Sequence, residues 1–170
     1  MYYLNYFFIF SIIGHIYETV LFKIIDEKGT SGFLYGYWTS VYGIGVVLIL
    51  FISKYIFKSL KINKFLEVLI FLVAIFFILT IIEFLGGHIL HFIFHKDFWN
   101  YSLLKHNIGK YICLEVSIVW VILSLIFLYL IKPWMDKIVL KIPKEVTILF
   151  IVLFLIDLTC TIFIKNKLVQ

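Results

Sequence analysis

Five long apolar runs constrain the fold of this chain more than any other feature of its sequence. They cover about residues 2–25, 37–57, 65–94, 111–131 and 146–164. Each run meets or exceeds the roughly 20 residues that a helix needs to cross a hydrocarbon layer of about 30 Å. The runs are apolar on every side and do not alternate, which argues against a β-barrel. The sequence therefore predicts an all-α, polytopic integral membrane helix bundle, with about five transmembrane helices in a single domain over residues 1–170.

The charge pattern supports this class and excludes a nucleic-acid-binding domain. Only 15% of the 170 residues are charged, against about 25% in a soluble domain. The net charge of +5 comes from lysines that lie between apolar runs and form no basic face on a polar domain. We therefore expect membrane lipid, and no nucleic acid, among the partners.

The distribution of lysines predicts the orientation. Eight of them fall in two compact loops, after the second and the fourth run: Lys54, Lys58, Lys61, Lys64, Lys132, Lys137, Lys141 and Lys144. The positive-inside rule places these loops and the N-terminus in the cytoplasm. The expected location is the bacterial cytoplasmic (inner) membrane.

The third run is too long for a perpendicular span, since thirty helical residues extend about 45 Å. The Gly86-Gly87 pair lies where a kink or a helix end costs least. One interpretation is a break there, followed by a short interfacial helix over residues 88–95. The other is one long tilted helix.

Ionisable side chains gather toward one membrane face. They include Glu18, Glu83, Lys110, Glu115 and Asp157. A charge near the middle of the bilayer costs at least about 2.5–3.5 kcal/mol, so such a one-sided cluster favours a shared polar cavity built on Glu18, Glu83 and Lys110. The alternative is that these groups are interfacial and snorkel to water.

Helical spacing places further polar residues on two stripes. One holds Ser11, His15 and Glu18, and the other holds Lys110, Cys113, Ser117, Trp120 and Ser124. Because small and polar residues mark helix contacts in lipid, we expect both stripes to face the bundle interior.

Three histidines share one helical face after Glu83, namely His88, His91 and His95. Two or three imidazoles with a carboxylate are a possible Zn²⁺ site or acid/base pair. The spacing matches no metalloprotease motif, and histidines facing headgroups are the simpler interpretation. We therefore expect no metal and no cofactor, with His91 and His95 as weak metal candidates.

Several motifs recur in the same order in one bacterial family. They are GHIYE at 14–18, GFLYG at 32–36, VYGIG at 41–45, IEF at 82–84, FWNYS at 98–102 and NIGKYICL at 107–114, with Ser117 and Trp120 downstream. On these residues, over about positions 5 to 130, the chain resembles the ABC-transporter permease family called CmpB-like, or ABC transporter type IV.

The resemblance implies a set of site residues. Positions that match the family are Glu18, Tyr42, Gly43, Glu83, Trp99, Tyr101, Ser102, Cys113 and Trp120. Positions that depart from it include His15, His88, His91, Asn100 and Lys110, where the family usually has Trp, Tyr, Glu, Asp and Arg. The candidate catalytic residues are therefore Glu18 and Glu83. The candidate substrate-binding residues are Tyr42, Trp99, Tyr101, Ser102, Lys110 and Cys113.

Two functions stay open beside a purely scaffolding role. The first is a permease-like subunit that binds or passes a polar solute. It would need a homo-oligomer or a partner, because five helices enclose little volume. Any ATP hydrolysis would come from a separate ATPase subunit, because the sequence contains no G-x-x-x-x-G-K-[ST] motif. The second is a membrane-embedded enzyme acting on a lipid-linked or headgroup substrate. Its general base would be Glu83 or Glu18, Lys110 would hold an anionic group, and Trp99 and Tyr101 would line the entrance.

Overall fold

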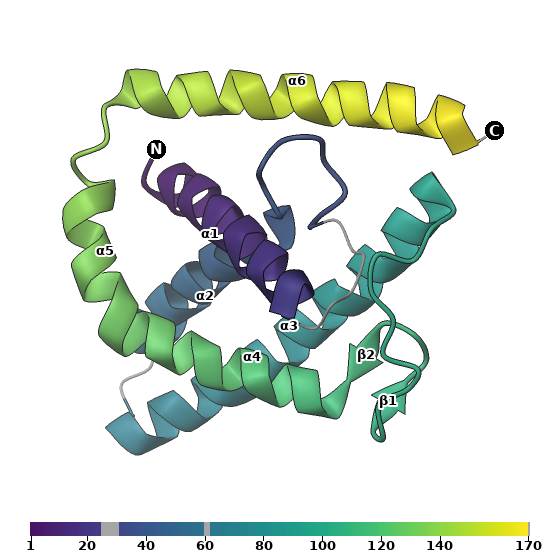
Figure 1. Cartoon of the computed structure of the whole chain (residues 1–170). Helices are drawn as coiled ribbons and strands as arrows, with labels where there is room; N and C mark the ends of the chain where they lie inside the picture. The colour runs from purple at the N-terminus through teal and green to yellow at the C-terminus, as the bar shows by residue number, and fades with distance from the viewer. Residues whose placement is uncertain (25–30, 60–61, 170) are drawn as a thin grey trace. The chain divides into compact units, whose positions relative to one another are not determined.

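The computed structural model describes residues 1–24, 31–59 and 62–169 and is mostly helical. Its elements are α1 (Tyr2–Ile24), α2 (Ser40–Ser59), α3 (Lys64–Phe94), the short strands β1 (Asn107–Ile108) and β2 (Ile112–Cys113), α4 (Leu114–Ile126), the π-helical turn η1 (Phe127–Ile131), α5 (Lys132–Val139) and α6 (Lys144–Val169) (Figure 1). Two residues from the sequence predictions, Ile25 and Lys61, lie outside the described residues, as does the side chain of Lys58.

Five helices of the described part of the chain are long and apolar enough to cross a membrane. They are Tyr2–Ile24, Ser40–Phe57, Lys64–Phe94, Leu114–Val139 and Lys144–Ile164. The predicted all-α membrane class is confirmed. The fourth helix starts later and ends later than the predicted 111–131, because a β-hairpin occupies its first positions and the helix continues through η1 and α5.

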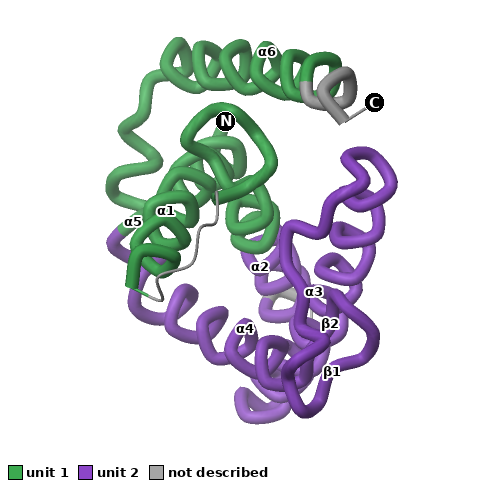
Figure 2. Tube along the Cα trace, turned by 45° about the vertical axis from the view of Figure 1, so that its right-hand side comes forward, with its two compact units in different colours: residues 1–47, 135–170 green, residues 48–134 purple. Residues whose placement is uncertain are grey.

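The chain divides into two compact units, which Figure 2 colours separately: residues 1–47 with 135–170, and residues 48–134. In the first unit, α1 packs on the start of α2 through two glycines. A Cβ on Gly14 would overlap the ring of Tyr42, and one on Gly43 would overlap Ser11 Oγ. Only glycine permits this close approach.

Contacts between α1 and α6 complete the first unit. The rings of Phe7 and Phe154 meet edge to face with centroids 5.3 Å apart. Thr147 Oγ1 donates to Asn5 Oδ1 (2.6 Å), and Asn5 Nδ2 donates to the Val139 carbonyl (3.2 Å). Interhelical bonds of this kind stabilise helix contacts in lipid, where no water competes for the groups.

In the second unit, α3 presents a row of buried residues spaced by four. The row is Glu67, Phe71, Ile75, Leu79, Glu83 and Gly87. Residues four apart are neighbours on a helix surface, so the row is continuous and winds slowly around α3 as it follows the buried side of the helix. Thr80 Oγ1 donates to Ser117 Oγ of α4 at 2.9 Å beside this row.

Helix α3 runs unbroken through the Gly86-Gly87 pair, which rules out the predicted break and separate interfacial helix and leaves the single long helix. The glycines permit close approach instead. A Cβ on Gly87 would overlap the Tyr111 ring, and one on Gly86 would lie 3.6 Å from the Trp99 ring. The helix ends at His95, whose backbone adopts the left-handed conformation (φ 49°) and whose N–H bonds the His91 carbonyl.

Candidate functional site

Glu83 is the central polar residue of the second unit. Its side chain, buried in the inward row of α3, is only 6% exposed. Oε1 accepts hydrogen bonds from Tyr101 Oη at 2.8 Å and from Trp120 Nε1 at 3.4 Å. Oε2 is buried and has no hydrogen-bond partner among the residues that the structure describes. One oxygen of this carboxyl group is therefore anchored and the other is unused.

Tyr101 reaches Glu83 from the loop between α3 and β1, and a hairpin holds this loop in place. The backbone N–H of Tyr101 donates to the Lys110 carbonyl at 2.7 Å. Strands β1 and β2 pair antiparallel, with Ile108 opposite Ile112. Gly109 supplies the positive φ (68°) between them, a conformation that glycine adopts without strain.

Asp97 ties the same loop to α3. Its carboxylate accepts hydrogen bonds from Tyr111 Oη (2.5 Å) and Lys110 Nζ (3.1 Å), and His91 Nδ1 of α3 lies 2.7 Å away. The Tyr111 hydroxyl and then Lys110 lower the pKa of Asp97 to about 2. The bond to Asp97 in turn raises the pKa of Tyr111 to about 12. Asp97 therefore holds Lys110 and Tyr111 beside the helix.

Aromatic rings pack where α3 carries its two glycines. The Tyr111 ring lies against Gly87 and the Trp99 ring against Gly86. Trp99 Nε1 donates to the Tyr111 carbonyl at 3.4 Å. Both rings thus lie one turn along α3 from Glu83.

Two predicted residues make local contacts in this region. Ser102 is exposed, and its N–H and hydroxyl both donate to Asn100 Oδ1, at 2.9 and 2.5 Å. Cys113 is fully buried and its thiol donates to Glu115 Oε2 at 2.5 Å. Burial raises the pKa of the Cys113 thiol, which makes it a weak nucleophile.

The predicted stripe on the fourth helix is correct only in part. Ser117 and Ser124 are buried, and Trp120 reaches Glu83. Lys110 and Cys113, however, do not lie on the helix, because the chain forms the β1–β2 hairpin before α4 begins at Leu114. The ammonium group of Lys110 is bonded to Asp97, while Glu83 is bonded to Tyr101 and Trp120.

In the first unit, the predicted stripe of α1 faces the segment 31–39. The Ser11 carbonyl accepts from the Thr39 N–H (2.9 Å), and the His15 ring meets the Tyr37 ring. Glu18 Oε2 accepts from Ser31 Oγ at 2.9 Å. Tyr42 packs over Gly14, so its ring lies in the contact between α1 and α2.

Asp157 of α6 also binds this segment, with both oxygens. Oδ1 accepts from the Tyr35 N–H at 3.1 Å, and Oδ2 accepts from the Gly36 N–H at 2.9 Å and Trp38 Nε1 at 2.6 Å. Thr161 Oγ1 lies 3.3 Å from Oδ1. These partners account for a charged residue within an apolar helix.

The three histidines near the end of α3 are exposed. His88 Nδ1 lies 2.9 Å from the Phe84 carbonyl, His91 contacts Asp97, and His95 ends the helix. Within the described ranges no group of three or more His, Cys, Asp or Glu residues is arranged to hold a metal ion.

Sequence reasoning missed Asp97 and Trp38. Asp97 is the only acidic residue between the last turn of α3 and β1, and Trp38 is separated from the start of α2 by Thr39 alone. Neither residue lies on a helical stripe, so the periodicity of the apolar runs could not reveal its partner.

The five apolar helices, with carboxylates bonded inside them, define a multi-pass membrane protein. A family model described as "Putative ABC-transporter type IV" matches residues 5–163, and the chain belongs to this family. The match confirms the resemblance and extends it into α6. No curated protein and no solved structure matches the chain.

Proposed function

We propose that this protein is a permease-like membrane subunit and that Glu83 binds the polar solute which it passes. The observation that carries this proposal is Glu83 Oε2, a buried carboxylate oxygen without a partner in the described part of the chain. An unsatisfied buried polar group costs about 1–3 kcal/mol, and ionisable residues within spanning helices mark solute pathways. The solute that fits a free carboxylate oxygen is a cation or a hydrogen-bond donor.

The surroundings of Glu83 support such a ligand. Tyr101 and Trp120 bond Oε1 and fix the carboxyl group, so that Oε2 is held in one position. Tyrosine and tryptophan are also residue types that bind organic ammonium groups. A small organic cation is therefore the solute class that we propose first.

A binding experiment tests this proposal. Wild-type protein and Glu83→Gln are placed in lipid nanodiscs and titrated with choline, ethanolamine and spermidine while the melting temperature is recorded. We expect at least one cation to stabilise the wild type and none to stabilise Glu83→Gln, because the amide keeps the shape but loses the charge. Equal stabilisation of both proteins, or of neither, contradicts a cation site at Glu83.

Family membership supports two kinds of partner. We propose that the subunit works with a separate ATPase subunit, since no phosphate-binding loop motif occurs in this sequence, or as a homo-oligomer, since the five spanning helices of the described residues enclose little volume. Copurification of a tagged chain from its own membrane, followed by an ATPase assay, distinguishes these two arrangements.

The alternative is a membrane-embedded enzyme in which Glu83 is a general base. The same unused oxygen favours it, because a base needs a free lone pair within reach of its substrate, and the Tyr101 hydroxyl could return the proton. Lys110, which we propose to hold an anionic group, would first have to leave Asp97. Loss of turnover by about 100-fold in Glu83→Gln, with no net solute flux in wild-type vesicles, favours the enzyme.

The orientation is also a proposal. The loop between α5 and α6 and the N-terminus lie in the cytoplasm, as the lysine distribution indicates. Single cysteines in residues 140–143, in a chain whose Cys113 and Cys160 are replaced by serine, should resist an impermeant thiol reagent in intact cells. Rapid labelling at these positions would show that the orientation is opposite to the proposed one.

A further inference from the structure

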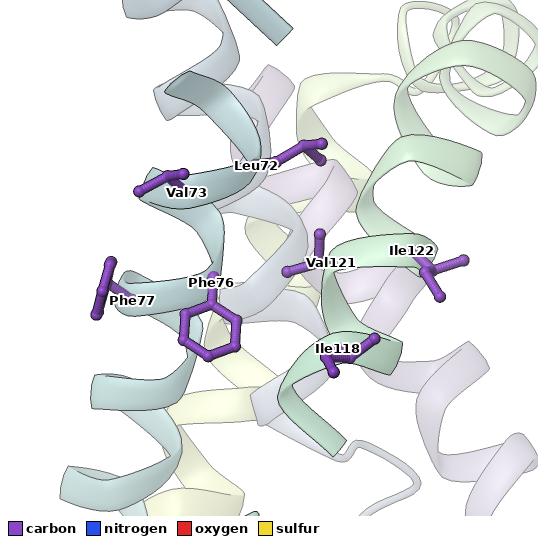
Figure 3. A pocket seen from close by; sticks show the side chains of 7 residues that line it. All are labelled: Leu72, Val73, Phe76, Phe77, Ile118, Val121 and Ile122. Atoms are coloured by element: carbon purple, nitrogen blue, oxygen red, sulfur yellow. The ribbon is translucent and has the colours of Figure 1, made fainter. Parts of the chain in front are cut away.

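A groove of about 240 Å³ lies between α3 and α4 in the second unit (Figure 3). Its lining is Leu72, Val73, Phe76, Phe77, Ile118, Val121 and Ile122. All seven side chains are hydrocarbon, and Figure 3 shows Phe76 and Val121 between the two helices. The outer residues open to the surroundings, since Val73 is 50% and Phe77 58% exposed.

The residue types of the lining decide what can fill it. Helices associate in lipid through small residues such as Gly, Ala and Ser, which let two backbones approach. The groove contains none of these, and its rim carries β-branched and aromatic side chains. A second helix therefore cannot pack closely here, whereas a narrow flexible hydrocarbon chain can.

The groove lies close to one end of α4. Ile118 comes four residues after Leu114, where α4 begins, which corresponds to about 6 Å along the helix axis. The Thr80–Ser117 hydrogen bond closes the helix contact next to it. A hydrocarbon chain in the groove therefore starts near the level of the segment 95–113, which leads into α4.

That segment has the chemistry of a membrane interface. Leu103 is fully exposed and Ile108 is 72% exposed. Lys96 and Lys105 are exposed as well, and within residues 62–164 they form no ion pair with a carboxylate. Exposed apolar residues beside lysines match an interface with anionic headgroups.

We propose that this groove is a binding site for one acyl chain of an anionic phospholipid, with the phosphate held at Lys105, whose neighbour His106 accepts a hydrogen bond from the Leu114 N–H at the start of α4. The inference does not depend on the solute site at Glu83, since it uses other residues and another ligand. It assigns the groove between α3 and α4 to a bound lipid of the surrounding membrane.

Photolabelling tests the site. The full chain is reconstituted in phosphatidylcholine vesicles that contain phosphatidylglycerol with a diazirine on one acyl chain. After illumination, mass spectrometry maps the labelled residues. We expect labels to concentrate on residues 72–77 and 118–122, above the level at equally exposed α6 residues such as Leu149 and Leu155.

Two matched variants sharpen the test. Val121→Phe fills the groove and should lower its labelling about tenfold, a loss of about 1.4 kcal/mol in binding. Val119→Phe makes the same change at an exposed position outside the groove and should leave labelling unchanged. Val73→Phe, at the exposed rim, replaces Val121→Phe if that variant does not fold. Lys105→Gln should abolish the preference for phosphatidylglycerol over a labelled phosphatidylcholine, whereas Lys96→Gln, beyond the far end of α3, should leave it unchanged.

Three results would overturn the proposal. The first is even labelling of all lipid-facing residues. The second is equal labelling in the groove-filling and control variants. The third is crosslinking between two copies through groove residues, which would assign this face to a second chain.

Discussion

Each of the two units bonds a carboxylate of an apolar helix to an aromatic loop, but the two carboxylates are used differently. Asp157 accepts hydrogen bonds from the segment 31–39 with both oxygens. Glu83 accepts two bonds on Oε1 and leaves Oε2 without a partner in the described residues. A fully bonded carboxylate stabilises the fold, whereas an unused buried oxygen is available to a ligand.

The loops themselves show the same contrast. The segment 31–39 depends on Asp157, which binds its backbone directly. The segment 95–113 does not depend on Glu83 alone, because its Asp97 contacts His91 of α3 and joins the two ends of the segment through Lys110 and Tyr111. Removing the charge of Asp157 should therefore destabilise the first unit, whereas removing the charge of Glu83 should leave the second unit folded.

Asp157→Asn gives the largest expected effect on folding. The amide offers one acceptor oxygen where the carboxylate offers two, so at least one of the three donors of residues 35–38 loses its partner. We expect a loss of about 2–3 kcal/mol in unfolding free energy, the scale of hydrogen bonds to a charged group. Thermal unfolding in detergent measures it. A variant as stable as the wild type would remove the contrast between the two carboxylates.

The adjacent glycines of α3 give the next largest effect and provide their own control. Gly87→Ala drives a Cβ into the Tyr111 ring and should cost about 1–3 kcal/mol, as overpacking does. In Gly86→Ala the added Cβ makes only ordinary van der Waals contact with Trp99. This variant should gain up to about 1 kcal/mol in unfolding free energy from helix propensity. Equal effects in the same unfolding experiment would show that Tyr111 does not pack against Gly87.

Lowering the pH should weaken the Asp97 contacts, and we expect a smaller loss of stability than in the substitutions above. The folded pKa of about 2 lies below the ordinary value for aspartate. A lowered pKa contributes stability above the ordinary value of about 4, and this contribution is lost as pH falls through 4 toward 2. The melting temperature should fall over that window in the wild type and less in Asp97→Asn. Identical pH profiles would show that Asp97 does not hold the loop.

Most of the fold can be predicted from the sequence, because the patterns that indicate spanning helices are local. Apolar runs identify the spanning helices. Part of the site can be predicted for the same reason, since Ser117 and Trp120 lie on a helical stripe. The approach of Glu18 to Glu83 stays a prediction, because the two residues belong to different units.

What the sequence did not reveal depends on tertiary contacts. The partner of Lys110 is Asp97 in a loop, and no periodicity connects a loop residue with a hairpin residue. Gly86 and Gly87 leave both a helix break and one long helix open in the sequence, because glycine weakens helices. Their neighbours Trp99 and Tyr111 come from a distant part of the chain, and only that packing explains an unbroken helix.

The thermal unfolding of Glu83→Gln in the absence of any solute tests the central claim most directly. If Glu83 is kept for a ligand, the variant should melt at or above the wild-type temperature, because burying an amide costs less than burying a carboxylate. Its Oε1 can still accept from Tyr101 and Trp120. A decrease as large as that of Asp157→Asn would contradict the account and make Glu83 a structural residue.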